Sequence, residues 1–340
     1  MKAAIIAAPG ELSIVDVENP TPAAGEVVIE VLRVGICGTD LHVLDGEHRS
    51  VRFPVIAGHE FAGRVVERGP QTSYPDIGDL VAVDPMIFCG HCGQCRDGWT
   101  NLCENGGGLG TTRNGAFAEY VAVSAQQCQR LTEEFPWEWG ILVEPLSCAL
   151  HAVDRIGATL GKKALVIGAG PMGLLLTNLL SHAGALVDVS ERSTERLQMA
   201  EGFGARRSAE SADSFGDSID WDIVIDATGN PAAIAEGLRL VRRAGSFGFV
   251  GLTPGHAEIP LSGYDVVMKE LTIVGSNSVR HSFRRAVDLL ASGSIAADSL
   301  LEPAVPLADI SSAFEQTRRG LGLKHSVLPS SAMPTNGGPR

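Results

Sequence analysis

The sequence predicts a two-domain α/β protein in which an all-β, barrel-like domain is joined to a doubly wound parallel sheet. A chain of 340 residues is longer than a domain with a single hydrophobic core usually is, so two domains are expected. The first 150 or so residues contain short β-branched runs separated by glycine and proline. After residue 154 the pattern changes to alternating strands and helices, which is typical of a parallel sheet.

The barrel-like domain is expected to be discontinuous, comprising residues 1–153 and 295–340. Strands are expected at 27–34, 60–67 and 79–83, where β-branched residues recur. A short helix at 310–319 is expected to rejoin this domain. Residues 329–340 have no apolar pattern and are predicted to be a disordered tail.

The second domain is expected to span residues 154–294. Short buried runs predict its strands, and amphipathic segments between them predict its helices. The expected strands are 164–167, 185–189, 221–226, 246–250 and 271–274. The expected helices are 172–182, 194–203, 232–241 and 283–291.

The composition excludes several classes of partner. The formal net charge of −13 argues against nucleic acid and anionic membrane surfaces, which select basic proteins. No apolar run approaches the roughly 20 residues that span a bilayer. The first residues alternate like a strand and lack the apolar stretch of a signal peptide, so a cytoplasmic location is expected. Cysteines there stay reduced, so the seven cysteines call for an explanation other than disulfides.

A glycine-rich loop follows the expected strand 164–167 and opens the next helix. Gly168 permits a tight turn, Gly170 lets the backbone approach a pyrophosphate, and Gly173 lets helix and strand pack closely. The helix begins at Pro171 and Met172, and its N-terminus offers a positive dipole end to phosphates. This loop therefore predicts a dinucleotide site.

Glu191 follows the second strand of that domain. An acidic residue there can accept hydrogen bonds from a ribose and repel a 2′-phosphate, which favours NAD. Arg192 beside it, and Arg196 one turn further on, are also predicted to face the cofactor. Since an arginine near this point can hold a 2′-phosphate, NADP stays open as an alternative.

Four of the cysteines lie within fifteen residues, at a spacing that can close a tetrahedral shell around zinc. These cysteines are Cys89, Cys92, Cys95 and Cys103. Zinc is favoured over an iron–sulfur cluster because it also explains a second group of residues, and the acidic charge disfavours a nucleic-acid-binding zinc ribbon. The loop is predicted to be a structural zinc site.

The second group is spread along the chain: Cys37, His59 with Glu60, and Glu144. Thiolate, imidazole and carboxylate are the ligand types of catalytic zinc, which keeps one coordination position open for substrate. Each residue alone would more often be structural.

Five motifs in this order resemble the zinc-dependent medium-chain dehydrogenases over roughly residues 1 to 325. They are Cys-Gly-Thr-Asp-Leu-His from Cys37, Gly-His-Glu from Gly58, the four-cysteine loop, Glu-Pro-Leu-Ser from Glu144, and the glycine-rich loop from Gly168. Residues 143–152 are most similar to the sorbitol (polyol) dehydrogenase branch. Two features depart from that branch: Val43 stands where it usually has tyrosine, and 275–280 resembles a glucose dehydrogenase segment.

The resemblance implies a GroES-like catalytic domain and a Rossmann domain, with the active site in the cleft between them. It implies two zinc ions per chain and a homodimer or homotetramer. Cys37 and His59 would be zinc ligands, Glu60 a ligand or its close neighbour, and Glu144 a ligand directly or through water. Thr39 and His42 match the family's proton relay.

The function implied is hydride transfer between a secondary alcohol of a polyol or sugar-like substrate and NAD, or NADP. A sugar (glucose-type), threonine or diol dehydrogenase is the nearest alternative. A zinc-free quinone reductase would lack both metal motifs. A non-catalytic regulatory protein that binds zinc and dinucleotide is the alternative of another class, and Thr39 and His42 speak against it.

Overall fold

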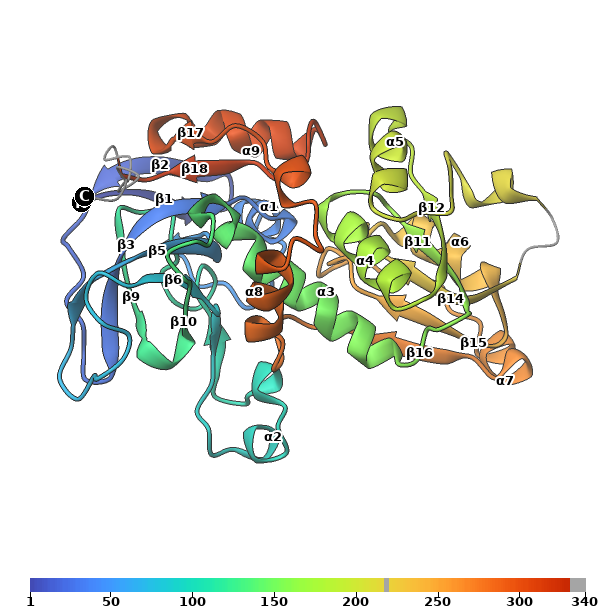
Figure 1. The fold of residues 1–340 in the computed structure, drawn as a ribbon, viewed down its shortest axis with the longest axis horizontal. Helices are drawn as coiled ribbons and strands as arrows, with labels where there is room; N and C mark the ends of the chain where they lie inside the picture. Colours follow the sequence, from blue (N-terminus) through green and yellow to red (C-terminus); the bar gives the residue numbers. More distant parts are fainter. Residues whose placement is uncertain (217–219, 331–340) are drawn as a thin grey trace. The chain divides into compact units, whose positions relative to one another are not determined.

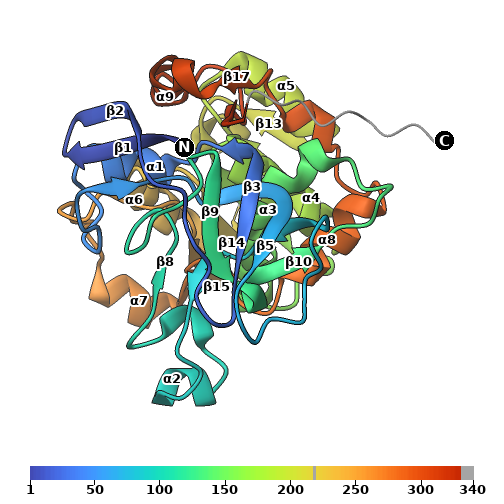
Figure 2. The same cartoon turned by 90° about the vertical axis from the view of Figure 1, so that its left-hand side faces the viewer.

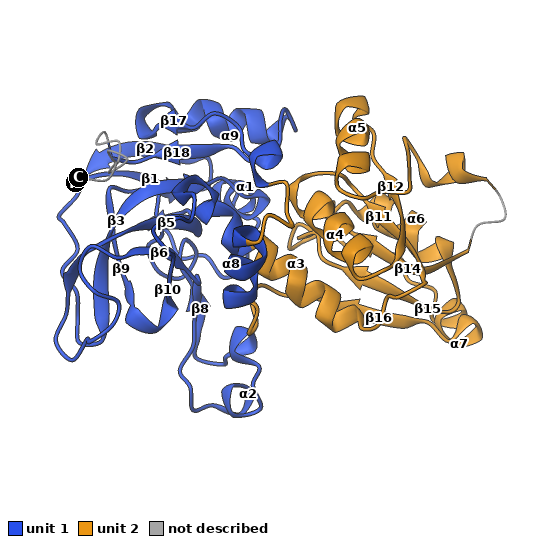
Figure 3. Ribbon diagram, viewed as in Figure 1, with its two compact units in different colours: residues 1–144, 283–291, 297–340 blue, residues 145–282, 292–296 orange. Residues whose placement is uncertain are grey.

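The computed structural model describes residues 1–216 and 220–330 of the chain (Figure 1). It divides into two compact units (Figure 3). Of the described residues, the first unit holds 1–144, 283–291 and 297–330, and the second holds 145–216, 220–282 and 292–296. The predicted tail from residue 331 onward lies outside the described residues.

The first unit is built mainly from short strands. They are β1 (Lys2–Ala8), β2 (Glu11–Asp16), β3 (Glu26–Gly35), β4 (Val55–Ile56), β5 (Glu60–Arg68), β6 (Leu80–Val83), β7 (Met86–Ile87), β8 (Gly107–Gly108), β9 (Tyr120–Ser124), β10 (Cys128–Arg130), β17 (Val305–Pro306) and β18 (Ser326–Leu328). Its helices are α1 (Gly38–Leu44), α2 (Gly93–Arg96), α8 (Phe283–Ala291) and α9 (Ile310–Arg318). Helix α3 (Val143–Ile156) begins in this unit and continues into the second.

The largest sheet of the first unit has the order β10-β6-β5-β3-β18-β17, and β9 also pairs with β3. Figure 2 shows β9, β3 and β5 side by side. Strand β3 is buried along almost its whole length and contributes Val27, Ile29, Val31 and Val34 to the core. Because β18 pairs with the end of β3, a segment near residue 327 joins the same sheet as residues 26–35.

The second unit is a six-stranded parallel sheet of order β13-β12-β11-β14-β15-β16. Its strands are β11 (Lys163–Ile167), β12 (Leu186–Ser190), β13 (Arg207–Ala209), β14 (Trp221–Asp226), β15 (Val241–Phe249) and β16 (Thr272–Gly275). Its own helices are α4 (Pro171–His182), α5 (Thr194–Gly202), α6 (Pro231–Leu240) and α7 (Gly263–Lys269). Helix α6 shows how sequence sets a boundary: Asn230 caps the N–H groups of Ala232 and Ala233, and Pro231 takes the first helical position.

The predicted fold class is confirmed, since a barrel-like unit accompanies a doubly wound parallel sheet. The unit boundaries differ from the predicted domain bounds at both junctions. Residues 145–153, which form most of α3, group with the second unit, and α8 groups with the first. Within the described residues, no helix is both long and apolar enough to cross a membrane.

Candidate metal centres and dinucleotide site

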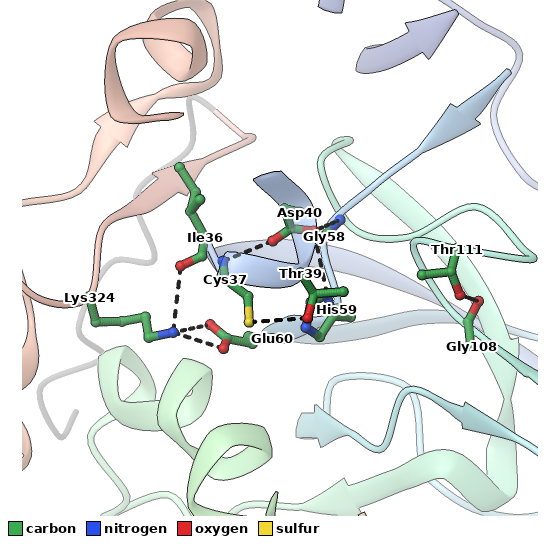
Figure 4. A network of polar contacts seen from close by, with 10 residues as sticks. All are labelled: Ile36, Cys37, Thr39, Asp40, Gly58, His59, Glu60, Gly108, Thr111 and Lys324. Atoms are coloured by element: carbon green, nitrogen blue, oxygen red, sulfur yellow. Dashed lines mark hydrogen bonds and ion pairs between the residues drawn. The ribbon is translucent and has the colours of Figure 1, made fainter. Parts of the chain in front are cut away.

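The register of two strands brings the first candidate metal centre together. Gly35, at the end of β3, pairs with Glu60, at the start of β5. Cys37 follows β3 and caps α1, and His59 precedes β5, so all three functional side chains meet at one end of this strand pair. The Cys37 thiol, an imidazole nitrogen of His59 and a carboxylate oxygen of Glu60 lie within 4.8 Å of one another (Figure 4). This donor set fits a catalytic zinc.

Asp40, a residue of the Cys-Gly-Thr-Asp motif, orders this cluster. Its side chain is fully buried, accepts a hydrogen bond from the Cys37 N–H at 2.9 Å and another from the Gly58 N–H at 3.0 Å. One carboxylate oxygen lies 3.4 Å from Nδ1 of His59 (Figure 4). A carboxylate behind a metal-binding histidine fixes the orientation of the ring. The sequence analysis did not single out Asp40, although its place between Cys37 and His42 was a usable signal.

Lys324 forms a buried ion pair with Glu60. The ammonium lies 2.8 and 2.7 Å from the two carboxylate oxygens and 3.5 Å from the Ile36 carbonyl oxygen (Figure 4). Burial alone would lower the pKa of Lys324, but the charges of Glu60 and Cys37 outweigh it and raise that pKa. A metal at this cluster would therefore share Glu60 with a cation. The sequence analysis missed Lys324, which lies 264 residues from Glu60.

Glu144 lies near the cluster but is not among its converging ligand atoms. It is 6% exposed at the start of α3, and its charge acts on both Lys324 and Asp84. Burial raises the pKa of Asp84 to about 7, opposed by a hydrogen bond from the Met86 N–H and reinforced by Glu144. A buried carboxylate whose charge reaches Lys324, the partner of Glu60, is compatible with a role beside the metal, directly or through water.

The two predicted relay residues share helix α1. Thr39 and His42 are three residues apart, so they lie on one face of the helix. The Thr39 hydroxyl oxygen is 3.7 Å from the Cys37 sulfur. His42 Nδ1 is 2.7 Å from a carboxylate oxygen of Glu47. Thr39 therefore faces the cluster, and His42 is tied to a partner in the turn that follows.

Arg113 and Asn114 carry side chains that could bind substrate hydroxyls, but both have structural partners. Arg113 pairs with Glu26 at 3.0 Å. The Asn114 side chain accepts a hydrogen bond from the Ile56 N–H at 3.1 Å. Both side chains would have to leave these partners before they could bind substrate hydroxyls.

The four-cysteine loop converges on a second candidate centre. The sulfurs of Cys89, Cys92, Cys95 and Cys103 all lie within 4.8 Å of one another. The sulfurs of Cys92 and Cys103 are 3.9 Å apart, close to the ~3.8 Å edge of a tetrahedron with zinc–sulfur bonds of about 2.3 Å. Backbone N–H groups of His91 and Cys92 lower the pKa of Cys89 to about 6, which favours the thiolate that zinc needs. Four converging thiols fill the tetrahedral shell of a zinc ion and therefore fit a structural zinc.

The glycine-rich loop of the second unit has the conformation that a pyrophosphate site requires. Gly168 directly follows β11 and has a φ of +96°, a conformation that favours glycine. A Cβ at Gly173 would collide with the carbonyl oxygen of Gly168. Gly170 caps α4, whose first residues Pro171 and Met172 follow it directly. A helix N-terminus behind an open glycine loop suits the binding of phosphate.

Glu191 is fixed against this loop. Its two carboxylate oxygens accept hydrogen bonds from the N–H groups of Ala169, at 2.8 Å, and Ser193, at 3.0 Å. The guanidinium of Arg196 approaches Gly170 closely enough to contact a Cβ placed there. Arg192 is exposed beside Glu191. The structure thus places Glu191 and Arg196 beside the loop, and Arg192 follows Glu191 in the chain.

Known sequence families match both parts of the chain. The Alcohol dehydrogenase GroES-like domain family matches residues 23–133, and the Glucose dehydrogenase C-terminus family matches residues 137–322. D-arabitol-phosphate dehydrogenase of Enterococcus avium is 31% identical over 95% of this chain and 96% of its own length. L-threonine 3-dehydrogenase of Pyrococcus horikoshii is 37% identical over 77% of this chain and 78% of its own.

Solved structures give the same result. A zinc-binding dehydrogenase from Sinorhizobium meliloti bound to NADP is 32% identical, with a TM-score of 0.90 over 96% of this chain and 99% of its own. An alcohol dehydrogenase from Escherichia coli in complex with NADH is 30% identical, with a TM-score of 0.89 over 96% and 99%. The chain belongs to the zinc-dependent medium-chain dehydrogenase family. It is an oxidoreductase of the type that uses zinc and NAD or NADP.

Proposed function

We propose that this dehydrogenase oxidises a secondary hydroxyl of a polyol or sugar-like substrate with NAD as the hydride acceptor, or catalyses the reverse reduction. The observation that supports it most strongly is the convergence of Cys37, His59 and Glu60 within 4.8 Å, beside Thr39 and in a chain that also carries a dinucleotide loop. The donors come from a thiol, an imidazole and a carboxylate, which is the set expected for alcohol chemistry rather than for a structural metal.

The chain's own residues would bind the reactants and move the proton. Zinc held by Cys37 and His59, with Glu60 or Glu144 beside it, would supply a Lewis acid that favours the alkoxide form of the substrate. The nicotinamide cofactor supplies the hydride acceptor. Thr39 would take the hydroxyl proton and pass it toward His42. Asp40 holds the backbone of Cys37 and the imidazole of His59 in place, and Lys324 balances the negative charge at Glu60.

A polyol is favoured as substrate by two arguments. Two relatives, D-arabitol-phosphate dehydrogenase and L-galactonate-5-dehydrogenase, are named for substrates with several hydroxyls. Both are more than 30% identical to this chain over more than 90% of its length. Glu144 and Glu47 are acidic groups close to the cluster or its relay, and carboxylates accept hydrogen bonds from neighbouring hydroxyls. The similarity to L-threonine 3-dehydrogenase makes an amino alcohol the second candidate.

NAD is favoured over NADP by the position of Glu191. Two backbone N–H groups hold its carboxylate against the phosphate loop, where it would accept hydrogen bonds from the ribose and repel a 2′-phosphate. Arg192 and Arg196 oppose this repulsion, and the Sinorhizobium meliloti relative binds NADP. The enzyme is therefore expected to prefer NAD without excluding NADP.

We further propose two zinc ions per chain, one in each cluster, and a homodimer or homotetramer in the cytoplasm. The assembly is supported by an open sheet edge in the second unit, because among the described residues β16 pairs with β15 on one side and is the last strand of the sheet order. Apolar side chains are exposed on β16, on α7 and just before α7. They include Leu261, Tyr264, Val267, Met268 and Ile273. Such an edge favours association with another chain.

A substrate screen tests the proposal. Sugar alcohols, hexoses, threonine and butanediol are offered with NAD and with NADP, and the reduced cofactor is followed by its absorbance. We expect the highest kcat/KM with a polyol and NAD. Threonine as the best substrate would replace the polyol proposal with an amino-alcohol one.

A further inference from the structure

The turn after α1 places Glu47 against the relay histidine. Its carboxylate oxygen lies 2.7 Å from Nδ1 of His42. The backbone builds this contact, because the N–H groups of Glu47 and His48 both donate to the His42 carbonyl oxygen, at 2.8 and 3.2 Å. The chain thus folds back on its own helix end, and the imidazole and carboxylate meet without help from a bound ligand.

This contact determines which nitrogen of His42 can accept a proton. An ionised carboxylate only accepts hydrogen bonds, so Nδ1 must carry the hydrogen and Nε2 must carry the lone pair. A histidine held in this way by a carboxylate has the tautomer of a general base. The side chains of His42 and Glu47 are 20% and 28% exposed, so the pair also reaches solvent.

We propose that Glu47 is the terminal residue of the proton relay: it fixes the tautomer of His42 and receives its Nδ1 proton. This inference rests on the proposed alcohol oxidation. When Nε2 of His42 takes up the proton released from the substrate hydroxyl, an N–H bond forms there. The Nδ1–H bond then breaks, its proton passes to the carboxylate oxygen of Glu47, and Glu47 releases it to water. Before the next turnover the Nε2–H bond of His42 breaks and its proton goes to solvent, while Nδ1 takes a proton back from water through Glu47, which restores the Nδ1–H tautomer. Hydride acceptance by NAD completes the balance.

The charged neighbours leave Glu47 available for this role. Helix α9 packs against α1 and carries Arg318, whose guanidinium makes two 2.7 Å bonds to Asp45 and acts on Glu47 only through its charge. Glu315, on the same helix, also faces Arg318. Burial, reinforced by His59 and His42, lowers the pKa of His48, so this ring adds no positive charge beside Glu47 at neutral pH.

Two substitutions separate the two parts of the role. Glu47→Gln keeps an oxygen that accepts the Nδ1–H bond but cannot take up the proton. Glu47→Leu removes the acceptor as well. Glu315→Gln is the matched control, because it makes the same charge change near Arg318 without a bond to His42. Each variant is measured with the alcohol that the wild type oxidises best.

We expect Glu47→Gln to lower kcat about tenfold, a part of the 10²–10⁴-fold that general acid–base catalysis contributes. The KM values for NAD and alcohol should stay within twofold, the solvent deuterium isotope effect on kcat should rise, and added imidazole buffer should restore the rate. Nitrogen-15 NMR of the His42 ring should show the Nδ1–H tautomer in the wild type and in Glu47→Gln, and a mixture in Glu47→Leu. Glu315→Gln should match the wild type throughout.

Wild-type kcat and isotope effect in Glu47→Gln would overturn the inference. So would a loss that imidazole does not restore and that accompanies a lower thermal stability, because that would show a structural ion pair only. An unchanged tautomer in Glu47→Leu would overturn the orienting part. Failure of the proposed function is a different result: the wild type itself would oxidise no alcohol.

Discussion

Removing Lys324 should destabilise the protein strongly, because its partner is buried beyond the reach of water. The side chains of Lys324 and Glu60 are 5% and 1% exposed. In Lys324→Met the side chain keeps its approximate length, but Glu60 loses hydrogen bonds of 2.8 and 2.7 Å. Breaking a buried pair from one side costs about 3–5 kcal/mol. Because about 1 kcal/mol shifts Tm by 2–4 °C in a unit of this size, the melting temperature should fall by roughly 6–20 °C.

Differential scanning calorimetry of the zinc-loaded protein measures this loss. The double variant Lys324→Met, Glu60→Gln is the control, since it removes the unpaired charge and should recover most of the stability. Zinc addition to chelated protein should also raise Tm more in Lys324→Met than in the wild type, because the freed carboxylate becomes available to the metal. A fall of less than 2 °C in the single variant would refute the claim that this pair is buried and coupled.

Three further substitutions test other parts of the site. Cys103→Ser should lose one of two zinc ions and lower Tm, because three thiolates no longer close the shell; unchanged metal content by elemental analysis would speak against a structural zinc. Glu191→Ala should shrink the ratio of kcat/KM for NAD over that for NADP, since the repulsion of a 2′-phosphate disappears, whereas an unchanged ratio would leave Glu191 a loop-bracing residue only. Glu144→Gln should cost at least 10²-fold in kcat/KM, roughly 2.7 kcal/mol of transition-state stabilisation, with a smaller loss for a substrate with one hydroxyl. A Glu144→Gln enzyme within threefold of the wild type would exclude a role at the metal.

The sequence predicts those features that depend on neighbours along the chain. The glycine loop, its strand and its helix lie within twenty residues, so propensity and spacing determine them together. The four cysteines likewise lie in one loop, and the structure brings all four sulfurs together as predicted. The two-unit fold is predicted by the change near residue 154 from short β-branched runs to alternating strand and helix patterns.

Features that depend on long-range register could not be predicted in this way. The Lys324–Glu60 pair depends on β18 joining β3, and nothing near Lys324 indicates a carboxylate 264 residues earlier. Asp40 lay within a recognised motif, but its contacts to Gly58 and His59 form only once the two loops meet. The boundary between the two units falls inside α3, after Glu144, whereas the sequence pattern changes only near residue 154. Arg113 and Asn114 have polar side chains that could bind substrate hydroxyls, but tertiary contacts pair Arg113 with Glu26 and Asn114 with the Ile56 N–H.

The most direct test of the account measures steady-state turnover and metal content together. Zinc-loaded wild type and Cys37→Ser are each offered a panel of sugar alcohols and simple alcohols with NAD. We expect the wild type to reduce NAD with a polyol at a kcat/KM at least tenfold above that with a simple alcohol. Cys37→Ser should bind NAD, keep the zinc of the four-cysteine loop and show no turnover. Polyol oxidation that survives in Cys37→Ser, or a wild type that binds NAD and zinc but oxidises no alcohol, would contradict the assignment of catalysis to the Cys37, His59 and Glu60 cluster.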